Sequence, residues 1–267
     1  MRKSLLYLFV MLAVQLSASW IVYVIWLVAD GWTLGDALRI VKSPSPMTHT
    51  AEMMITASVV CSVITLAIFV WRKWCLVSPA YLRTRQWGVF TWSGMAALGF
   101  ILPSLWLQEQ LPEMPNVMEE TFRNILSNDY GYFAICLFAP LVEEIVFRGA
   151  ILRALLAGFK RHWVAIAVSA VLFSLAHANP AQIPHTLLMG LLLGWMYYRT
   201  GSVLPGVMLH WVNNTVAFVM ARLLPMESAD TLSSLLGVDN RGVVLALIFS
   251  LMILIPALYQ LHLRMRR

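Results

Sequence analysis

Two adjacent glutamates, Glu143 and Glu144, lie inside a long apolar stretch of the chain and are followed by Arg148. An ionisable side chain inside a membrane-spanning helix is costly, and such residues usually have a function. Glu144 and Arg148 are four residues apart, so they share one helix face and can form an ion pair. Glu143 points about 100° away from that face, toward other groups. The pattern predicts a carboxylate available for chemistry beside a supporting ion pair.

Two further pairs have the same helical spacing in later apolar stretches: Phe173 with His177, and His210 with Asn214. Each pair alone is a weak signal, because a membrane histidine often only hydrogen-bonds a neighbouring helix. Three helices that all carry polar groups, however, avoid the cost of lipid by meeting one another. A carboxylate beside an imidazole can take a proton from water. A second imidazole and an amide can stabilise an oxyanion, which completes a set for water attack on a peptide carbonyl.

The motifs Glu143-Glu144-x-x-x-Arg148, Phe173-x-x-x-His177 and His210-x-x-x-Asn214, in this order, resemble those of the CAAX-protease and bacteriocin-processing (CPBP, or Abi) family. The resemblance covers about residues 130–220. It implies an eight-helix bundle and an intramembrane endopeptidase in which a glutamate activates water. By the family pattern, Glu143 and His177 activate the water, and His210 and Asn214 stabilise the oxyanion. The supporting motif residues are Glu144, Arg148 and Phe173.

Other interpretations of these residues stay open. Glu143, His177 and His210 form a His₂Glu set that can bind catalytic zinc. The HExxH motif is absent, and an asparagine suits an oxyanion better than zinc, so the residues favour a mechanism without a cofactor. A transporter would show inverted repeats or broken helices at matching positions, and the sequence shows neither. A non-catalytic membrane partner on the same fold is a further alternative, which the complete motif set disfavours.

The composition places these motifs in a membrane. Of the 267 residues, 60% are hydrophobic and 12% are charged, whereas ordinary soluble domains carry about 25% charged residues. A soluble domain of this length cannot bury so much apolar surface, so lipid is the expected solvent. The net charge of +6 forms no basic stripe, so nucleic acid is not an expected partner. Cys61, Cys75 and Cys136 form no CxxC pair and are expected to be packing residues.

Eight apolar stretches are candidates to cross a bilayer, which takes about 20 residues. They lie near 5–28, 53–71, 88–107, 130–156, 163–178, 184–198, 203–223 and 243–259. The first exceeds the ~7–15 apolar residues of a signal peptide, so it is interpreted as an uncleaved helix. We therefore expect an all-α polytopic membrane helix bundle with about eight transmembrane helices. It would form a single domain over 1–267, with a protease core at about 130–222 and the other helices as scaffold.

Basic residues predict the orientation of the bundle. With the N-terminus inside, thirteen Lys and Arg fall in inner segments and five in outer segments or outer helix ends, with Arg148 set aside. This asymmetry fits the positive-inside rule for eight spans. We expect both termini in the cytoplasm and a multi-pass protein of the cell (inner) membrane. The expected partners are the lipid bilayer and a membrane protein or peptide substrate, but nothing in the sequence identifies the cleavage site or a prenyl group.

Overall fold

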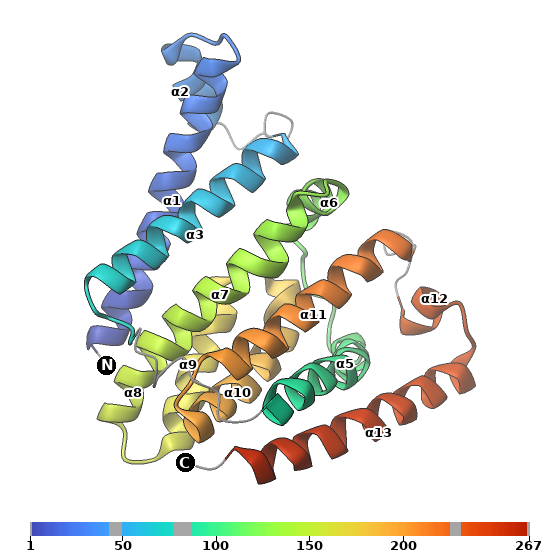
Figure 1. Cartoon of the computed structure of the whole chain (residues 1–267). Coiled ribbons are helices and arrows are strands. Elements are labelled where there is room, and N and C mark those ends of the chain that lie inside the picture. The colour runs from blue at the N-terminus through green and yellow to red at the C-terminus, as the bar shows by residue number, and fades with distance from the viewer. Residues whose placement is uncertain (1, 43–49, 77–86, 225–230, 266–267) are drawn as a thin grey trace.

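The computed structural model describes residues 2–42, 50–76, 87–224 and 231–265, and every element in these ranges is a helix. The elements are α1 (Arg2–Ala29), α2 (Leu34–Lys42), α3 (Ala51–Trp71), α5 (Trp87–Glu109), α6 (Glu119–Ser127), η2 (Phe133–Phe138), α7 (Ala139–Glu143), η3 (Glu144–Leu152), α8 (Arg153–Gly158), α9 (His162–Ala176), η4 (Pro180–Gln182), α10 (Ile183–Thr200), α11 (Leu204–Leu223), α12 (Leu232–Leu236) and α13 (Asn240–Arg264). Figure 1 shows the long helices packed in one bundle, with α2, α6 and α12 along the border opposite the two chain ends. The predicted all-α polytopic bundle is confirmed.

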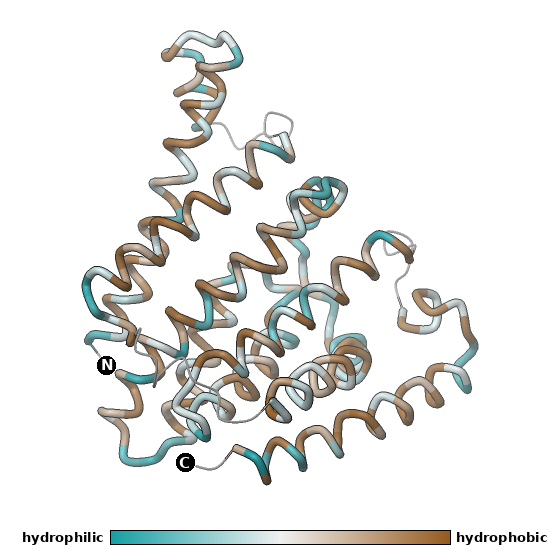
Figure 2. The backbone as a smooth tube through the Cα atoms, viewed as in Figure 1, coloured by the Kyte–Doolittle hydropathy of each residue, from teal (hydrophilic) through white to brown (hydrophobic). Residues whose placement is uncertain are grey.

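Each of the eight apolar stretches coincides with a helix or, for 130–156, with the continuous helical run from η2 to α8. Hydrophobic residues extend along most of every long helix (Figure 2). Within the described ranges, four helices are long and apolar enough to cross a membrane: α1, α3, α5 and α13. Helix α9 is apolar but shorter, with 15 residues. Eight crossings therefore stay a prediction, because the helices that carry the polar motifs are shorter, more polar or irregular.

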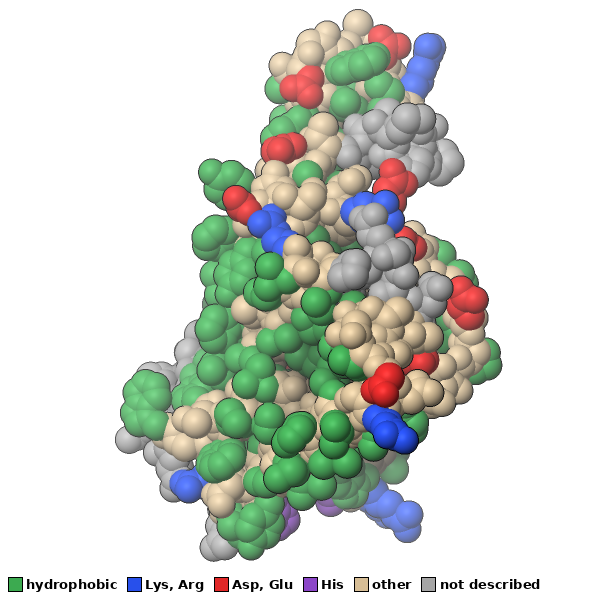
Figure 3. All heavy atoms as spheres, turned by 90° about the vertical axis from the view of Figure 1, so that its right-hand side faces the viewer, with side chains coloured by type: hydrophobic (Ala, Val, Ile, Leu, Met, Phe, Trp, Pro, Cys, Tyr) green, Lys and Arg blue, Asp and Glu red, His purple; other side chains and the backbone are tan. Residues whose placement is uncertain are grey.

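Much of the apolar surface faces outward, as lipid-facing helices require. Leu16, Phe249 and Ile255 have exposed fractions of 75%, 63% and 62%. In the view of Figure 3, hydrophobic side chains cover the central and lower part of the face, and acidic side chains lie toward the top and the right-hand border. Such a surface is far larger than the apolar patches of soluble monomers, so the fold is that of a membrane protein.

Both chain ends lie at the same end of the bundle. In the first turn of α1, Ser4 Oγ donates a hydrogen bond to Ile151 O near the end of η3, at 3.4 Å. At the last turn of α10, Arg199 Nε donates to Met265 O, the last described residue, at 2.7 Å. Figure 1 shows the N- and C-terminal ends on the same side. The first and last described residues of the chain therefore lie on the same side of the bundle.

Contacts at the opposite end join the other set of connections. Asn128 Nδ2, before η2, donates to Glu52 Oε1 in the first turn of α3 at 3.0 Å. Leu232 N, at the start of α12, donates to Glu109 Oε2 at the end of α5 at 3.1 Å. Successive long helices thus alternate in direction, as the predicted topology requires.

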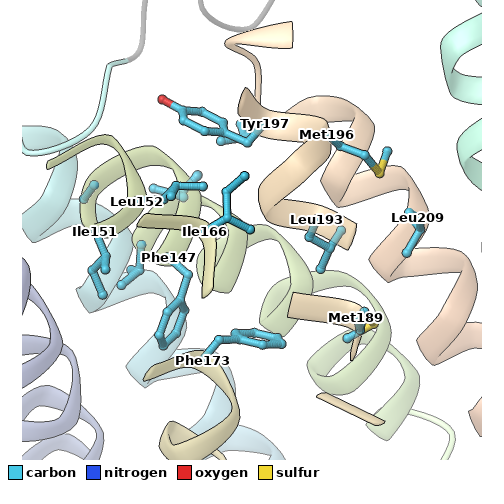
Figure 4. Packing of buried hydrophobic residues seen from close by; sticks show 14 of the residues in the cluster. Phe147, Ile151, Leu152, Ile166, Phe173, Met189, Leu193, Met196, Tyr197 and Leu209 are labelled. Atoms are coloured by element: carbon cyan, nitrogen blue, oxygen red, sulfur yellow. The ribbon is translucent and has the colours of Figure 1, made fainter. Parts of the chain in front are cut away.

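Close packing of α9 against α10 forms the centre of the fold. Gly190 and Gly194 lie on one face of α10, and a Cβ on Gly190 would come within 3.0 Å of Ala170 Cα. A Cβ on Gly194 would lie 2.9 Å from Ile166 Cγ2. This is the small-x-x-x-small pattern by which membrane helices approach closely. Large apolar side chains fill the space around this contact, among them Phe147, Ile151, Leu152, Phe173, Met189 and Leu193 (Figure 4).

All three cysteines are free and buried, as expected for packing residues. Cys75 lies in the connection after α3, and burial raises the pKa of its thiol above the usual range. A buried thiol of this kind forms little thiolate at neutral pH and is chemically inert.

Candidate active site

Glu143 is the last residue of α7, where the helical run changes to the π-helical segment η3. Its Oε2 atom lies 4.0 Å from His177 Nε2 and 3.8 Å from His210 Nε2. His177 directly follows α9, and His210 lies in α11. Three separate helices thus bring a carboxylate and two imidazoles together around one oxygen atom.

The second nitrogen of each imidazole determines where its proton lies. His177 Nδ1 is 2.8 Å from Phe173 O, which can only accept, so this nitrogen carries the proton. His210 Nδ1 is 3.3 Å from Glu144 Oε1, which accepts when the carboxylate is ionised. In the neutral rings, both Nε2 atoms therefore have a free lone pair. Glu143 Oε2 is likewise buried and has no hydrogen-bond partner in the described part of the chain.

The three acceptors are spaced for a molecule that donates to them. Separations of 3.8 and 4.0 Å are too long for direct hydrogen bonds. They are close to the separation of two acceptors that share one water, each at about 2.8 Å. The Glu143 and His177 side chains are 25% and 20% exposed, whereas His210 is 2% exposed. Water can therefore approach from the side of Glu143 and His177.

The zinc alternative uses the same three residues. Tetrahedral zinc with ligands at about 2.0–2.1 Å holds neighbouring ligand atoms about 3.3–3.4 Å apart. Both nitrogens lie farther than this from Glu143 Oε2, at 3.8 and 4.0 Å. Among the described residues, no group of three or more His, Cys, Asp or Glu side chains is arranged to hold a metal ion. The two histidine nitrogens thus lie farther from the Glu143 oxygen than the ligand atoms of a bound zinc ion lie from one another.

Glu144 and Arg148 form a buried ion pair directly behind His210. Arg148 Nη1 lies 2.9 Å from Glu144 Oε1, and the two side chains are 1% and 0% exposed. Arg148 Nη2 also donates to Gly190 O at 3.4 Å, and the guanidinium lies 4.3 Å from the centre of the Phe173 ring. Such contacts offset part of the cost of removing both charges from water. Arg148 thus holds Glu144 in place, and Glu144 holds the His210 ring.

Phe173 lies between the ion pair and the two imidazoles. Its ring centre is 4.8 Å from that of His177 and 5.9 Å from that of His210, both in edge-to-face geometry. On its other side, Phe147 packs edge-to-face at 5.1 Å (Figure 4). These are favourable aromatic arrangements. Phe173 therefore fixes the positions of both rings.

Asn214 lies one helical turn beyond His210, and its amide is already engaged. Its Nδ2 donates to Ile135 O in η2 at 3.0 Å, and its Oδ1 accepts from Asn213 Nδ2 at 3.2 Å. In a π-helix, each carbonyl accepts a hydrogen bond from the N–H five residues later in the chain. For the Ile135 carbonyl, that donor would belong to residue 140. Because Pro140 has no N–H, this carbonyl would lack its helical partner. Asn214 replaces the missing donor and ties α11 to η2.

The comparison with known families identifies the segment that holds these groups. Residues 129–216 match the family described as Type II CAAX prenyl endopeptidase Rce1-like. This segment is therefore similar to the core of a CAAX protease. It contains every motif from Glu143 to Asn214, so the resemblance to the CAAX-protease family is confirmed over these residues. The match supports a CAAX-type intramembrane protease. No curated protein and no solved structure matches the chain.

Gly206 lies in the matched segment and contacts the site, although it belongs to none of the three motifs. A Cβ at this position would lie 2.7 Å from Glu144 Oε2 and 3.4 Å from Glu144 Cδ. Only glycine leaves space for the carboxylate between Arg148 and His210. A signal was present in the sequence, because Gly206 and His210 share one face of α11 at i, i+4 spacing.

A third histidine, His185, lies near the core although no motif contains it. Its Nδ1 is 2.9 Å from Ser104 Oγ in α5, which itself donates to Ile101 O at 2.8 Å. The Ser104 oxygen therefore accepts from His185 Nδ1. His185 also lies close enough to His177 and His210 to interact with them electrostatically. Helix α5, expected to be scaffold, thus contacts the surroundings of the site.

Proposed function

We propose that this protein is an intramembrane endopeptidase that hydrolyses a peptide bond of a membrane-associated protein or peptide with a glutamate-activated water. The supporting observation is the convergence of His177 Nε2 and His210 Nε2 on Glu143 Oε2. Peptide hydrolysis requires a water that loses a proton as it attacks, and a carboxylate with a neutral imidazole can accept that proton.

In this proposal, Glu143 and His177 orient and activate the water. The hydrogen bond from His177 Nδ1 to Phe173 O keeps His177 Nε2 an acceptor. As the water oxygen attacks the carbonyl carbon, Glu143 takes one of its protons. The same proton is then available for the nitrogen that leaves when the peptide bond breaks, so one carboxyl group serves as base and then as acid.

His210 and Asn214 are the proposed donors to the oxyanion. Asn214 Nδ2 has two hydrogens, and the bond to Ile135 O uses one of them. His210 donates from Nε2 only in its doubly protonated form, whose second proton would come from solvent before the attack, and the positive ring would then face the Glu144 carboxylate through Nδ1. Donors fixed in this way stabilise the charge that develops on the carbonyl oxygen.

The direct test is cleavage by the Glu143→Gln variant. Wild-type protein in lipid vesicles would be offered a library of lipid-anchored and transmembrane peptides, with products identified by mass spectrometry. We expect cleavage by the wild type and none by Glu143→Gln, because an amide cannot accept a proton from water. Thermal unfolding of the variant should match that of the wild type. Glu113→Gln, which changes an exposed carboxylate before α6, is the matched control and should stay active.

Three results would contradict parts of this proposal. Full activity of Glu143→Gln would remove the glutamate from the chemistry. Loss of activity on zinc chelation, with recovery on adding zinc, would make Glu143, His177 and His210 metal ligands. A folded wild type that cleaves no peptide in the library would favour a non-catalytic membrane partner or a transporter.

A further inference from the structure

A cavity that is lined by none of the polar motif residues gathers three basic side chains. It has a volume of about 420 Å³, lies between the start of α1 and the junction of η3 with α8, and is lined by Arg2, Lys3, Tyr7, Ala150, Arg153, Ala154 and Ala157. No acidic side chain lines it, and Arg2, Lys3 and Arg153 form no ion pair with any residue that the structure describes. Three like charges around one hollow repel one another unless an anion lies between them.

The walls of this cavity are held by contacts of their own. The hydrogen bond from Ser4 Oγ to Ile151 O fixes the first turn of α1 against η3. Arg153 Nη2 donates to Trp74 O at 2.8 Å, which leaves its other nitrogens available to a ligand. The Tyr7 ring packs against Trp74 with ring centres 4.9 Å apart. The Tyr7 hydroxyl makes no hydrogen bond within the described ranges, and Tyr7 is one of the residues that line the cavity.

We propose that this cavity binds the phosphate headgroup of an anionic membrane phospholipid. Arginine, lysine and a phenol are the side chains that bind phosphate oxygens. Ala150, Ala154 and Ala157 make the remaining wall apolar, and Leu6 and Phe9, in the same part of α1 as Tyr7, are 48% and 68% exposed. Basic pockets between helices at the cytoplasmic side of membrane proteins recognise anionic lipid headgroups in this manner. An acyl chain has apolar surface to follow here, which a free phosphate would not use.

The bound lipid would connect α1 to the helical run that carries Glu143 and Glu144. Arg153 continues that run, whereas Arg2 and Lys3 belong to α1. A phosphate that contacts both segments neutralises their mutual repulsion, so the lipid should stabilise the folded protein through mass action. This inference does not depend on the proposed protease activity.

The experiment measures lipid retention in nanodiscs of phosphatidylcholine with or without phosphatidylglycerol. Native mass spectrometry of the released wild type should show one retained phosphatidylglycerol, and the melting temperature should be higher in discs that contain it. The Arg2→Gln/Lys3→Gln variant alters no contact within the described chain. It should bind about 25-fold more weakly, because each basic side chain near an anionic surface contributes roughly fivefold.

A matched double variant distinguishes a site from general charge attraction. Lys160→Gln/Arg161→Gln removes the same charge from exposed residues beyond α8 that do not line the cavity. It should retain the lipid as the wild type does, and equal losses in both variants would overturn the proposal. Inorganic phosphate added to pure phosphatidylcholine discs is the second arm. If phosphate alone raises the melting temperature as much as the lipid does, the ligand is a soluble phosphate and the lipid assignment fails.

Discussion

Glu143 and Glu144 are neighbours in the chain, yet their surroundings differ completely. Glu143 is 25% exposed and faces two imidazoles, whereas Glu144 is fully buried and paired with Arg148. The sequence could predict this division, because successive helical residues point about 100° apart and residues four apart share a face. It could not predict that Glu144 also faces His210, since that contact joins helices distant in the chain.

The Arg148→Ala variant should be strongly destabilised. It leaves the Glu144 carboxylate buried without its cation, which typically costs about 3–5 kcal/mol. Chemical unfolding in detergent would measure the loss. Arg123→Ala is the control, because Arg123 and Glu119 have the same spacing but are 50% and 58% exposed. An exposed pair contributes about 0.3–0.5 kcal/mol.

A double variant shows whether the stranded charge is the cause. Adding Glu144→Gln to Arg148→Ala removes the buried charge and should recover part of the lost stability. If the double variant is less stable than Arg148→Ala, the loss comes from the packing of Arg148 against Phe173 and Gly190 rather than from its charge.

Gly206→Ala should disturb the site without introducing any polar group. The new Cβ would lie 2.7 Å from Glu144 Oε2, whose carboxylate is held by Arg148 and His210 and cannot easily move. Overpacking of this kind costs about 1–3 kcal/mol. The free energy of unfolding and the cleavage rate should both fall below those of Gly158→Ala, where a Cβ meets no atom within 4 Å. Wild-type values for Gly206→Ala would show that the carboxylate is free to shift.

At the scale of helices, apolar length and spacing predicted most elements but not their internal irregularity. The eight apolar stretches coincide with the observed helices because burial and lipid exposure both select such runs. The π-helical segments η2 and η3 were not predicted, since they depend on contacts made across the bundle. Pro140 was the available signal, because a proline inside an apolar run leaves an unpaired carbonyl. The Gly190-x-x-x-Gly194 spacing is a second signal in the sequence, because it predicts the close contact of α10 with another helix.

The bond between Asn214 and Ile135 leads to a prediction about η2. Asn214→Ala removes a proposed oxyanion donor and should lower turnover by roughly 10²–10³-fold, with substrate binding nearly unchanged. It also leaves the Ile135 carbonyl without a partner, which should cost about 1–3 kcal/mol of stability. Measurements of kcat, KM and chemical unfolding separate the two effects.

Pro140→Ala provides a backbone donor that can replace the asparagine in the second role. The N–H of the new alanine is five residues after Ile135, so it can donate the π-helical hydrogen bond to Ile135 O. The double variant Asn214→Ala/Pro140→Ala should therefore regain stability but not turnover. Recovery of turnover together with stability would show that Asn214 acts only through the position of η2.

At the scale of the whole molecule, the basic residues and the contacts between helix ends agree. Arg2, Lys3, Arg153 and Arg199 belong to the end of the bundle that carries both chain ends. Other residues of the predicted inner group, Arg83, Arg85, Arg266 and Arg267, lie outside the described residues. The sequence alone could assign the segments that carry these basic residues to one side of the membrane by their charge. It could not show which helices touch at each end, because that depends on packing.

The remaining prediction is that this end faces the cytoplasm. Negative lipids and the membrane potential both favour basic residues on the cytoplasmic side. A reporter fused after the C-terminal residue, or inserted after Lys73, should be read as cytoplasmic, and one inserted at Glu113 as external. Because Ser4 and Arg199 bind residues at the same end, the two termini must share a side in any orientation. An external C-terminus with a cytoplasmic N-terminus would contradict the helix order itself, whereas two external termini would overturn only the orientation.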